Sequence, residues 1–304
     1  MSVEPPQDRP SGLPQALGAY ILWGFLPLYL LLVTNVPPFE FVGWRIIWTL
    51  PLCLVIVAFR RQFPEIRAAI TNPRVLVMLF VSAVLIAINW FMYIWAIMEG
   101  NVYAASLGYY LNPLINVLLG TMLLGERLSK WQWVAVSVAA VAVAILAAGA
   151  LTTLWISLTL AFSFGMYGMV RKQVVVGALP GLTIESAILL LPAGAIAYIY
   201  AVSAAGPSFG TDFVMSALIM FSGVVTAVPL LLFAIAARRM EYSTLGFIQY
   251  LAPTIVFLLG LFVFGEELKP VQLISFMLIW TAVVIFAGDL WVRSSRAKRA
   301  AIVA

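Results

Sequence analysis

Long apolar runs, each closed by charged residues, proline or glycine, divide most of the chain into ten segments. Each segment is close to the roughly 20 apolar residues that a helix needs to cross a bilayer. The predicted spans cover residues 14–34, 39–59, 75–97, 102–124, 131–149, 152–170, 182–204, 214–236, 243–264 and 271–291. The boundary between the fifth and sixth spans is the least clearly marked, because only AGALTT around Gly149 interrupts the apolar run. This pattern predicts an all-α membrane protein with ten transmembrane helices.

The chain also repeats itself. YLNPLINVLLGTMLLGERL from Tyr110 aligns without a gap with YLAPTIVFLLGLFVFGEEL from Tyr250, and 11 of the 23 positions from Tyr110 to Gln132 are identical at an offset of 140. Each copy therefore holds five spans, and because five is odd the second copy enters the membrane upside down. The sequence predicts a first repeat over residues 14–149 and a second over 150–291, with an N-terminal tail at 1–13 and a basic C-terminal tail at 292–304.

The repeated Gly–Glu pair has a structural interpretation. Gly125 and Gly265 are expected to end a helix, and Glu126 and Glu266 then precede the next helix. Ser129 and Gln132 have the spacing of a capping box for the fifth span, and Pro270 suits the first turn of the tenth.

Basic residues alternate with the spans. If the N-terminus is cytoplasmic, all but Arg45 and Lys269 of the 17 Lys and Arg residues, that is 15, fall on the cytoplasmic side. The positive-inside rule therefore supports ten spans with both termini in the cytoplasm. Topology and contact with anionic headgroups explain the basic loops, so no nucleic-acid partner is expected.

Composition narrows the classes of function. Hydrophobic residues make up 64% of the chain and charged residues 10%, against about 25% charged in a soluble domain. The chain has no histidine, and Cys53 is its single cysteine, so an internal disulfide is impossible and a metal or redox site is not expected. No nucleophile with a partner base and no Gly-rich phosphate loop is present, so neither an enzyme nor a cofactor is predicted.

Inverted repeats of membrane spans are typical of transporters that work by alternating access, with a solute site near mid-membrane. Polar and aromatic side chains within spans one, three, four and nine predict the lining of such a cavity. They are Trp23, Asn89, Tyr93, Tyr109, Asn112, Asn116, Gln249 and Tyr250. The alternative is that these groups hydrogen-bond between helices or form interfacial aromatic belts.

Arg45 is the one cation well inside a span, and it completes the predicted solute site. It would bind an anionic or zwitterionic solute, pair with Glu40 or Glu185, or extend outward to the interface. Glu185 itself is expected at the interface, near the start of its span.

Two pairs of equivalent residues predict a helix kink or gate in each repeat. Pro113 and Pro253 each remove a backbone hydrogen bond, and Gly120 and Gly260 follow seven residues later on surfaces suited to close packing.

Several stretches resemble a known family. NWFMYIWAIMEGN, AASLGYYLNPLINVLLG and STLGFIQYLAPT, together with ALGAYILWGFLPLY and the WRIIW around Arg45, are similar to RarD proteins of the EamA branch of the drug/metabolite transporter superfamily. The resemblance covers about residues 18–291. It implies two five-helix EamA repeats in the bacterial inner membrane and a permease, and the family name is associated with chloramphenicol sensitivity. It implies no list of binding residues.

The expected function is therefore secondary-active export of small amphipathic metabolites or drugs. The alternative on the same scaffold is a flippase for a lipid or lipid carrier, in which Arg45 would meet a headgroup phosphate. Expected partners are a small-molecule solute and membrane lipids, with assembly into a homo-oligomer left open.

Overall fold

The computed structural model describes residues 11–204, 206–265 and 267–303, and these form helices without any strand. The first half contains α1 (Leu13–Leu30), the 3-10 helix η1 (Leu31–Val33), α2 (Pro38–Arg60), α3 (Phe63–Thr71), α4 (Pro73–Met98), α5 (Val102–Met122) and α6 (Lys130–Ala147). After the 3-10 helix η2 (Ala148–Thr153) follow α7 (Leu154–Gln173), α8 (Ala178–Ala201), α9 (Phe213–Arg239), α10 (Tyr242–Gln249), α11 (Leu251–Phe262) and α12 (Pro270–Val303). The predicted tail at 1–13 lies outside the described residues except for its last three positions.

The long helices match the predicted spans, and the fold class is confirmed. Within the described part of the chain, nine segments are long and apolar enough to cross a membrane. One of them, Lys130–Gln173, has 44 residues and joins α6, η2 and α7. At about 1.5 Å per residue, 44 residues would extend roughly twice the ~30 Å hydrocarbon core. The helix axis breaks at Ala150, where φ is −140° and ψ is 31°, so this segment supplies the fifth and sixth of ten spans.

One helix was not predicted, and the two repeats differ at the positions where a kink was predicted. The short helix α3 connects α2 to α4 and is too short and too polar to cross the membrane. The ninth span consists of two helices, α10 and α11, which meet at Tyr250. Pro253 lies three residues beyond this junction and lacks the N–H that would continue the helical hydrogen bonding to Gln249. By contrast, α5 continues through Pro113 without interruption.

Helix packing follows the internal repeat. The first and second repeats contact each other through α2 and α8, through α5 and α10, and through α6 and α12. The packing of α4 on α7 has its counterpart in α9 on α1, and α5 on α7 has its counterpart in α11 on α1. These pairs exchange when each span is replaced by the equivalent span of the other repeat, as a pseudo-twofold axis requires.

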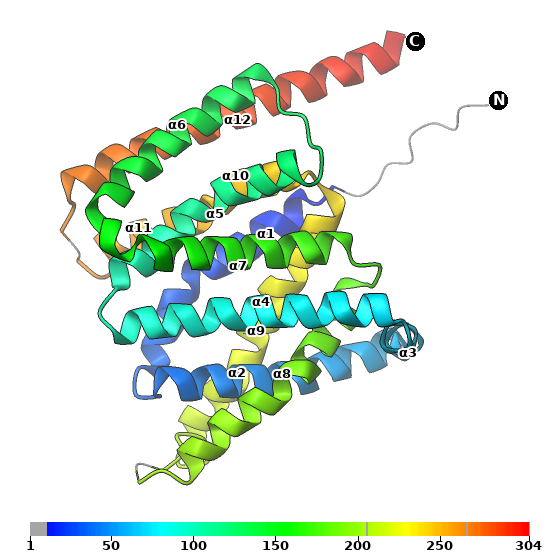
Figure 1. The fold of residues 1–304 in the computed structure, drawn as a ribbon, viewed down its shortest axis with the longest axis vertical. Coiled ribbons are helices and arrows are strands. Elements are labelled where there is room, and N and C mark those ends of the chain that lie inside the picture. Colours follow the sequence, from blue (N-terminus) through cyan, green and yellow to red (C-terminus); the bar gives the residue numbers. More distant parts are fainter. Residues whose placement is uncertain (1–10, 205, 266, 304) are drawn as a thin grey trace.

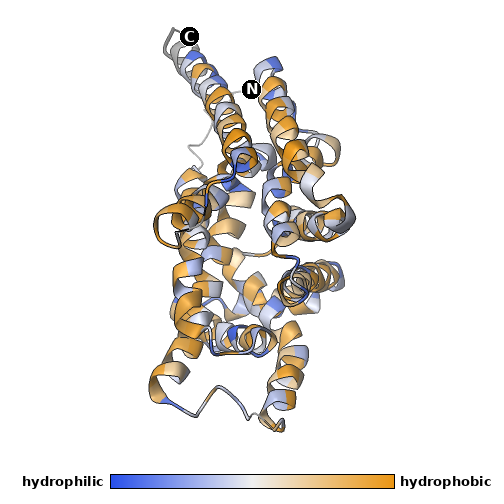
Figure 2. Ribbon diagram, turned by 90° about the vertical axis from the view of Figure 1, so that its left-hand side faces the viewer, coloured by the Kyte–Doolittle hydropathy of each residue, from blue (hydrophilic) through white to orange (hydrophobic). Residues whose placement is uncertain are grey.

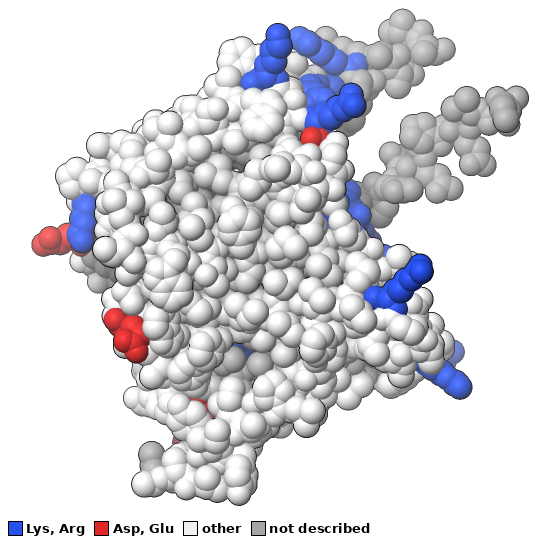
Figure 3. All heavy atoms as spheres, viewed as in Figure 1, with Lys and Arg blue, Asp and Glu red and all other residues white. Residues whose placement is uncertain are grey.

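The equivalent turns of the two repeats lie on opposite sides of the molecule. Gly125 after α5 and Gly265 after α11 have φ values of +69° and +66°, a left-handed conformation that glycine adopts at no steric cost. The loop after α5 is on the side of the chain termini, and the loop after α11 is on the other side (Figure 1). Basic side chains gather along the terminal side (Figure 3), which we call the basic face.

Capping interactions are also repeated. The Ser129–Gln132 capping box at the start of α6 is confirmed, with the Gln132 side chain accepting from Ser129 N at 2.8 Å. At the start of α12 the Gln272 side chain accepts from Lys269 N at 3.3 Å.

Apolar residues cover the outside of the bundle as well as its core (Figure 2). Phe59, Leu191 and Phe213 are each more than 80% exposed, as expected of side chains that face lipid. The interior also contains many small residues, which let helices pack closely. Gly24, for example, lies so close to Ile255 that an added Cβ would come within 2.7 Å of its side chain, which allows α1 and α11 to approach closely.

Candidate functional site

The strongest candidate site is centred on Arg45. Arg45 lies seven residues after Pro38, about 10 Å along α2 from the end opposite the basic face. Its Nε donates to Thr226 Oγ1 of α9 at 2.9 Å. Its guanidinium carbon lies 4.7 Å from the ring centroid of Trp90 on α4, which is a cation–π contact. One side chain of the first repeat is thus held by a helix of each repeat.

Neither carboxylate that the sequence offered as a partner pairs with Arg45. Glu40 is fully buried and already accepts three hydrogen bonds, from Trp44 Nε1 at 3.1 Å and from the backbone N and hydroxyl of Ser208 at 2.7 and 2.6 Å. Glu185 pairs with Arg171 instead. Among the described residues, no acidic group lies within ion-pair distance of Arg45, so its charge is not neutralised by the surrounding helices.

Three tyrosines lie in the neighbourhood of Arg45. Tyr93 of α4 and Tyr109 of α5 form an edge-to-face pair with centroids 5.8 Å apart. Both tyrosines, together with Tyr29, lie close enough to Arg45 to interact electrostatically with its charge. Tyr109 is 45% exposed although it is seven residues inside α5, so the aromatic wall of the site is accessible.

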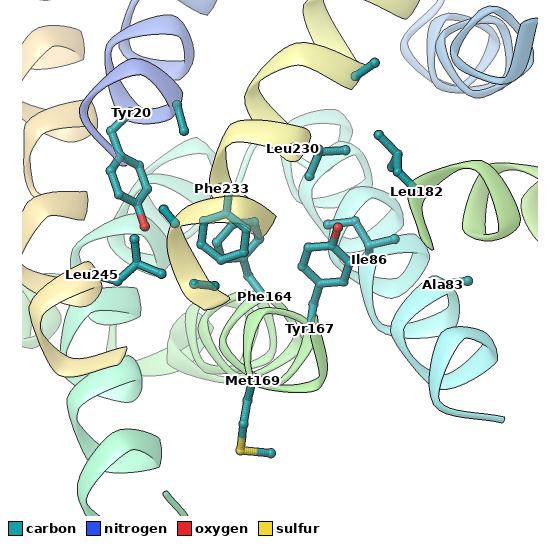
Figure 4. Close-up of a cluster of buried hydrophobic side chains, with 14 of the residues drawn as sticks. Tyr20, Ala83, Ile86, Phe164, Tyr167, Met169, Leu182, Leu230, Phe233 and Leu245 are labelled. Atoms are coloured by element: carbon teal, nitrogen blue, oxygen red, sulfur yellow. The ribbon is translucent and has the colours of Figure 1, made fainter. Parts of the chain in front are cut away.

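A small cavity connects this centre with a second polar cluster. Its volume is about 10 Å³, enough for about one water molecule. The lining residues are Ile46, Thr49, Ile86, Trp90, Tyr167, Leu182, Glu185, Ser186, Leu189, Thr226 and Leu230. Both residues that contact Arg45, Trp90 and Thr226, are among them, and so is Glu185. Figure 4 shows four of these lining residues, Ile86, Tyr167, Leu182 and Leu230, beside Phe233 of the aromatic core.

The second polar cluster is a buried ion pair. Arg171 Nη1 of α7 lies 3.5 Å from Glu185 Oε1 of α8, and the two side chains are 1% and 3% exposed. Ser82 of α4 donates a hydrogen bond to the same carboxylate, and Arg171 Nη2 donates to the carbonyl of Ala178 at 2.9 Å. Gly181 makes room for the guanidinium, since an added Cβ would lie 2.0 Å from Nη1. Glu185, expected at the interface, is thus buried within the bundle, two turns after the start of α8 at Ala178 and beside the last turn of α7.

Asn89 and Trp23 make contacts between helices and do not line the cavity. Asn89 Nδ2 donates to the carbonyl of Leu160 at 2.8 Å and to Ser163 Oγ at 3.1 Å, which joins α4 to α7. Trp23 packs against Phe164 and Phe233, with ring centroids 5.7 and 5.8 Å away. For these two residues the contacts agree with the alternative interpretation, in which they hold neighbouring helices together.

Asn112, Asn116, Gln249 and Tyr250 lie where α5 crosses α10. Asn116 Nδ2 donates to Gln249 Oε1 at 2.8 Å. The backbones approach closely here, because a Cβ on Gly246 would come within 2.9 Å of both the Asn116 Cβ and the Pro113 carbonyl. Tyr250 packs with Phe247 and Phe286, on the side of α10 that faces α6 and α12. The predicted set therefore divides into an Arg45 group with Tyr93 and Tyr109 and a separate group at this crossing.

The two prolines of the predicted gate occupy different settings in the two repeats. Pro113 lies within continuous α5, and Pro253 follows the α10–α11 junction. Gly120 packs against Glu126 and Ser243, and Gly120 and Gly260 are both buried in their helices.

Thr226 is the contact of Arg45 that sequence reasoning missed. It is a buried residue in an otherwise apolar span, and Ser222 lies one turn before it on the same face of α9. Two small polar residues four positions apart in an apolar span are the sequence feature that could have indicated a polar contact on this face of α9. The partnership of Arg171 with Glu185 had no comparable signal, because contacts between spans depend on how each helix is rotated.

Comparison with known proteins gives a consistent result. A model of the EamA-like transporter family matches residues 10–148. An uncharacterized transporter of Pseudomonas aeruginosa is 43% identical over 90% of this chain and 92% of its own length. Protein RarD of Escherichia coli strain K12 is 42% identical over 91% of this chain and 94% of that protein. One solved crystal structure has the same fold, with a TM-score of 0.70 at 19% identity over 90% of this chain and 96% of that chain.

Proposed function

This chain belongs to the EamA-like transporter family, alongside the RarD proteins, and we propose that it is a secondary-active transporter that exports small amphipathic metabolites or drugs. It is a multi-pass membrane protein, and relatives that are named transporters support transport as its general activity. The observation that carries the proposal is the contact of Arg45 in the first repeat with Thr226 in the second. A solute bound at this junction contacts both repeats, so movement of one repeat against the other changes the side from which the solute is reached.

Alternating access is the mechanism that the two repeats support. Because equivalent helices exchange neighbours across the pseudo-twofold axis, the repeats can exchange conformations at little cost in packing. One exchange would open the site to the opposite side of the membrane.

We propose that the basic face is cytoplasmic and that the protein resides in the bacterial inner membrane. The distribution of Lys and Arg supports this orientation, since the exposed residues Arg60, Arg74 and Arg239 lie at helix ends on that face and the exposed Arg127 lies in the loop between α5 and α6. The tyrosines and Arg45 then lie nearer the outer side.

The contacts at the basic face support a state that is closed to the cytoplasm. Lys172 Nζ of α7 donates to the carbonyls of Ala237 and Met240 at the end of α9, at 2.9 and 2.5 Å. Glu126 after α5 accepts hydrogen bonds from the start of α10. The Glu126 bonds join the two repeats at the basic face, and the Lys172 bonds join α7 to α9 within the second repeat. Export requires that these contacts open to admit solute.

Purified protein in liposomes tests the proposed activity. We expect it to accelerate the flux of at least one solute among amino acids, aromatic metabolites and chloramphenicol, relative to liposomes without protein. Arg45→Ala protein of equal abundance should lose most of that flux, whereas Arg60→Ala, at the exposed end of the same helix, should retain it.

The flippase alternative is tested in the same liposomes with a fluorescently labelled phospholipid. If the labelled lipid changes leaflet and no soluble compound crosses, the exporter proposal fails and the flippase takes its place.

A further inference from the structure

The Arg45 guanidinium has unused hydrogen-bonding capacity in the interior of a membrane protein. Arginine carries five N–H donors, and only Nε donates to a described residue, through the 2.9 Å bond to Thr226. The two terminal nitrogens make no hydrogen bond within the described ranges. A charged group at this depth is expensive unless it has a partner, so the free side of the guanidinium favours an anion.

The surrounding groups fix the guanidinium and keep it available. The bond to Thr226 anchors one edge, and the Trp90 ring covers one face at 4.7 Å. The two acids considered as partners of Arg45 have other partners, because Glu40 accepts from Ser208 and Glu185 pairs with Arg171. A planar fork held in this way matches an oxyanion, which accepts two parallel hydrogen bonds from the terminal nitrogens.

The aromatic residues beside Arg45 indicate the chemical nature of the uncharged part of the ligand. Tyr93 and Tyr109 meet edge to face beside Arg45, and Tyr109 is substantially exposed. Aromatic rings offer a large contact surface to another ring at little conformational cost. An apolar or aromatic body would therefore pack on the tyrosines while its charged end reaches Arg45.

We infer that the Arg45 site binds an oxyanion carried on an amphipathic, preferably aromatic, body. This inference rests on the proposed transport function and specifies its substrate class. A small aromatic carboxylate and the phosphate of a lipid headgroup share this chemistry, so the experiment includes both.

Binding is measured first, without transport, on the purified full-length chain in detergent. The probes are 3-phenylpropionate and its neutral amide, which differ only in the charged group. We expect 3-phenylpropionate to raise the melting temperature in a saturable way and the amide to leave it unchanged. Arg45→Gln should abolish the shift, and Arg45→Lys, which retains the charge but not the planar fork, should weaken the apparent affinity at least tenfold. Arg60→Gln removes the same charge from the exposed end of α2 and should bind as the wild type does.

Several outcomes decide the inference. A short-chain phosphatidic acid that shifts the melting temperature in an Arg45-dependent way, when 3-phenylpropionate does not, supports the oxyanion and assigns it to a lipid. Equal binding of the acid and the amide, or binding that survives in folded Arg45→Gln and Arg45→Lys proteins, overturns the inference. Absence of any Arg45-dependent shift with either anion also overturns it.

Transport in liposomes is then recorded separately. Arg45-dependent binding without flux would contradict the transport proposal and leave the oxyanion site standing. Flux of neutral solutes alone would support the transport proposal and contradict the oxyanion site.

Discussion

Glu126 and Ser243, 117 positions apart, join the two repeats at the basic face. The Glu126 Oε2 atom accepts from the backbone N of Ser243 at 2.8 Å and from its hydroxyl at 2.6 Å, while Oε1 accepts from the backbone N of Tyr242. These are the first residues of α10, whose N–H groups have no partner within the helix. The carboxylate that follows the end of α5 therefore acts as the N-terminal cap of a helix in the other repeat.

Removal of this cap should destabilise the protein. We expect Glu126→Ala to lower the free energy of unfolding by about 1–3 kcal/mol, because charge-assisted hydrogen bonds are lost and the α10 N–H groups are left unpaired. Thermal unfolding in detergent measures the effect. Glu99→Ala is the matched control, since Glu99 is exposed and should change stability by less than about 0.5 kcal/mol. Equal melting temperatures for the two variants would contradict the role assigned to Glu126.

Gly120 is required by the same contact. A Cβ at Gly120 would lie 2.5 Å from Glu126 Oε2 and 2.7 Å from Ser243 Oγ. Gly120→Ala should therefore destabilise the fold by about 1–3 kcal/mol through overpacking. Gly194→Ala is the control: Gly194 lies within α8 with no atom within 4 Å of an added Cβ, so this change should stabilise by about 0.5–1 kcal/mol. Chemical denaturation of both variants tests whether the two effects have opposite signs.

The sequence was sufficient for the spans and their inverted repeat, because lipid imposes a long apolar run on every crossing helix. It missed α3, since the polar stretch after Arg61 carries no membrane signal. A kink was predicted at both Pro113 and Pro253, but the ninth span divides at Tyr250, three residues before Pro253, whereas α5 continues through Pro113. The same residue type at the same place in both copies therefore did not predict the same local structure.

The site was less predictable than the fold for a physical reason. In a soluble helix a polar face identifies the buried side by contrast, but here both the lipid-facing and the protein-facing sides are apolar. Asn89 and Tyr93 lie on one face of α4, yet Asn89 bonds to α7 and Tyr93 contacts Tyr109 of α5. Helical spacing correctly places the two residues on one face of α4. Their roles differ because they contact different neighbouring helices, whose positions the sequence does not reveal.

The buried pair Arg171–Glu185 and the partly exposed pair Arg293–Asp289 should respond differently to mutation. Glu185→Ala leaves the Arg171 charge unpaired in the interior and should cost about 3–5 kcal/mol. Adding Arg171→Met to Glu185→Ala should recover part of this loss. Asp289→Ala should cost at most about 1 kcal/mol as an ion-pair partner, since Arg293 is 54% exposed and the groups are 4.0 Å apart. A double-mutant cycle on unfolding free energies measures both couplings, and a coupling at Arg171–Glu185 no larger than that at Arg293–Asp289 would contradict the prediction.

Tyr109 and Asn116, two turns apart on α5, should separate binding from stability. Tyr109 is exposed and faces Tyr93, whereas Asn116 is fully buried and donates to Gln249. Tyr109→Ala should weaken binding of 3-phenylpropionate by about 2–10-fold, the equivalent of one aromatic contact, with little change in unfolding. Asn116→Ala should instead lower stability by about 0.6 kcal/mol, the average measured for hydrogen bonds between membrane helices, and by no more than about 1.7 kcal/mol, and it should leave binding within twofold of the wild type. Parallel titrations and melting curves on both variants decide the matter, because a loss of affinity in Asn116→Ala equal to that in Tyr109→Ala would return Asn116 to the solute site.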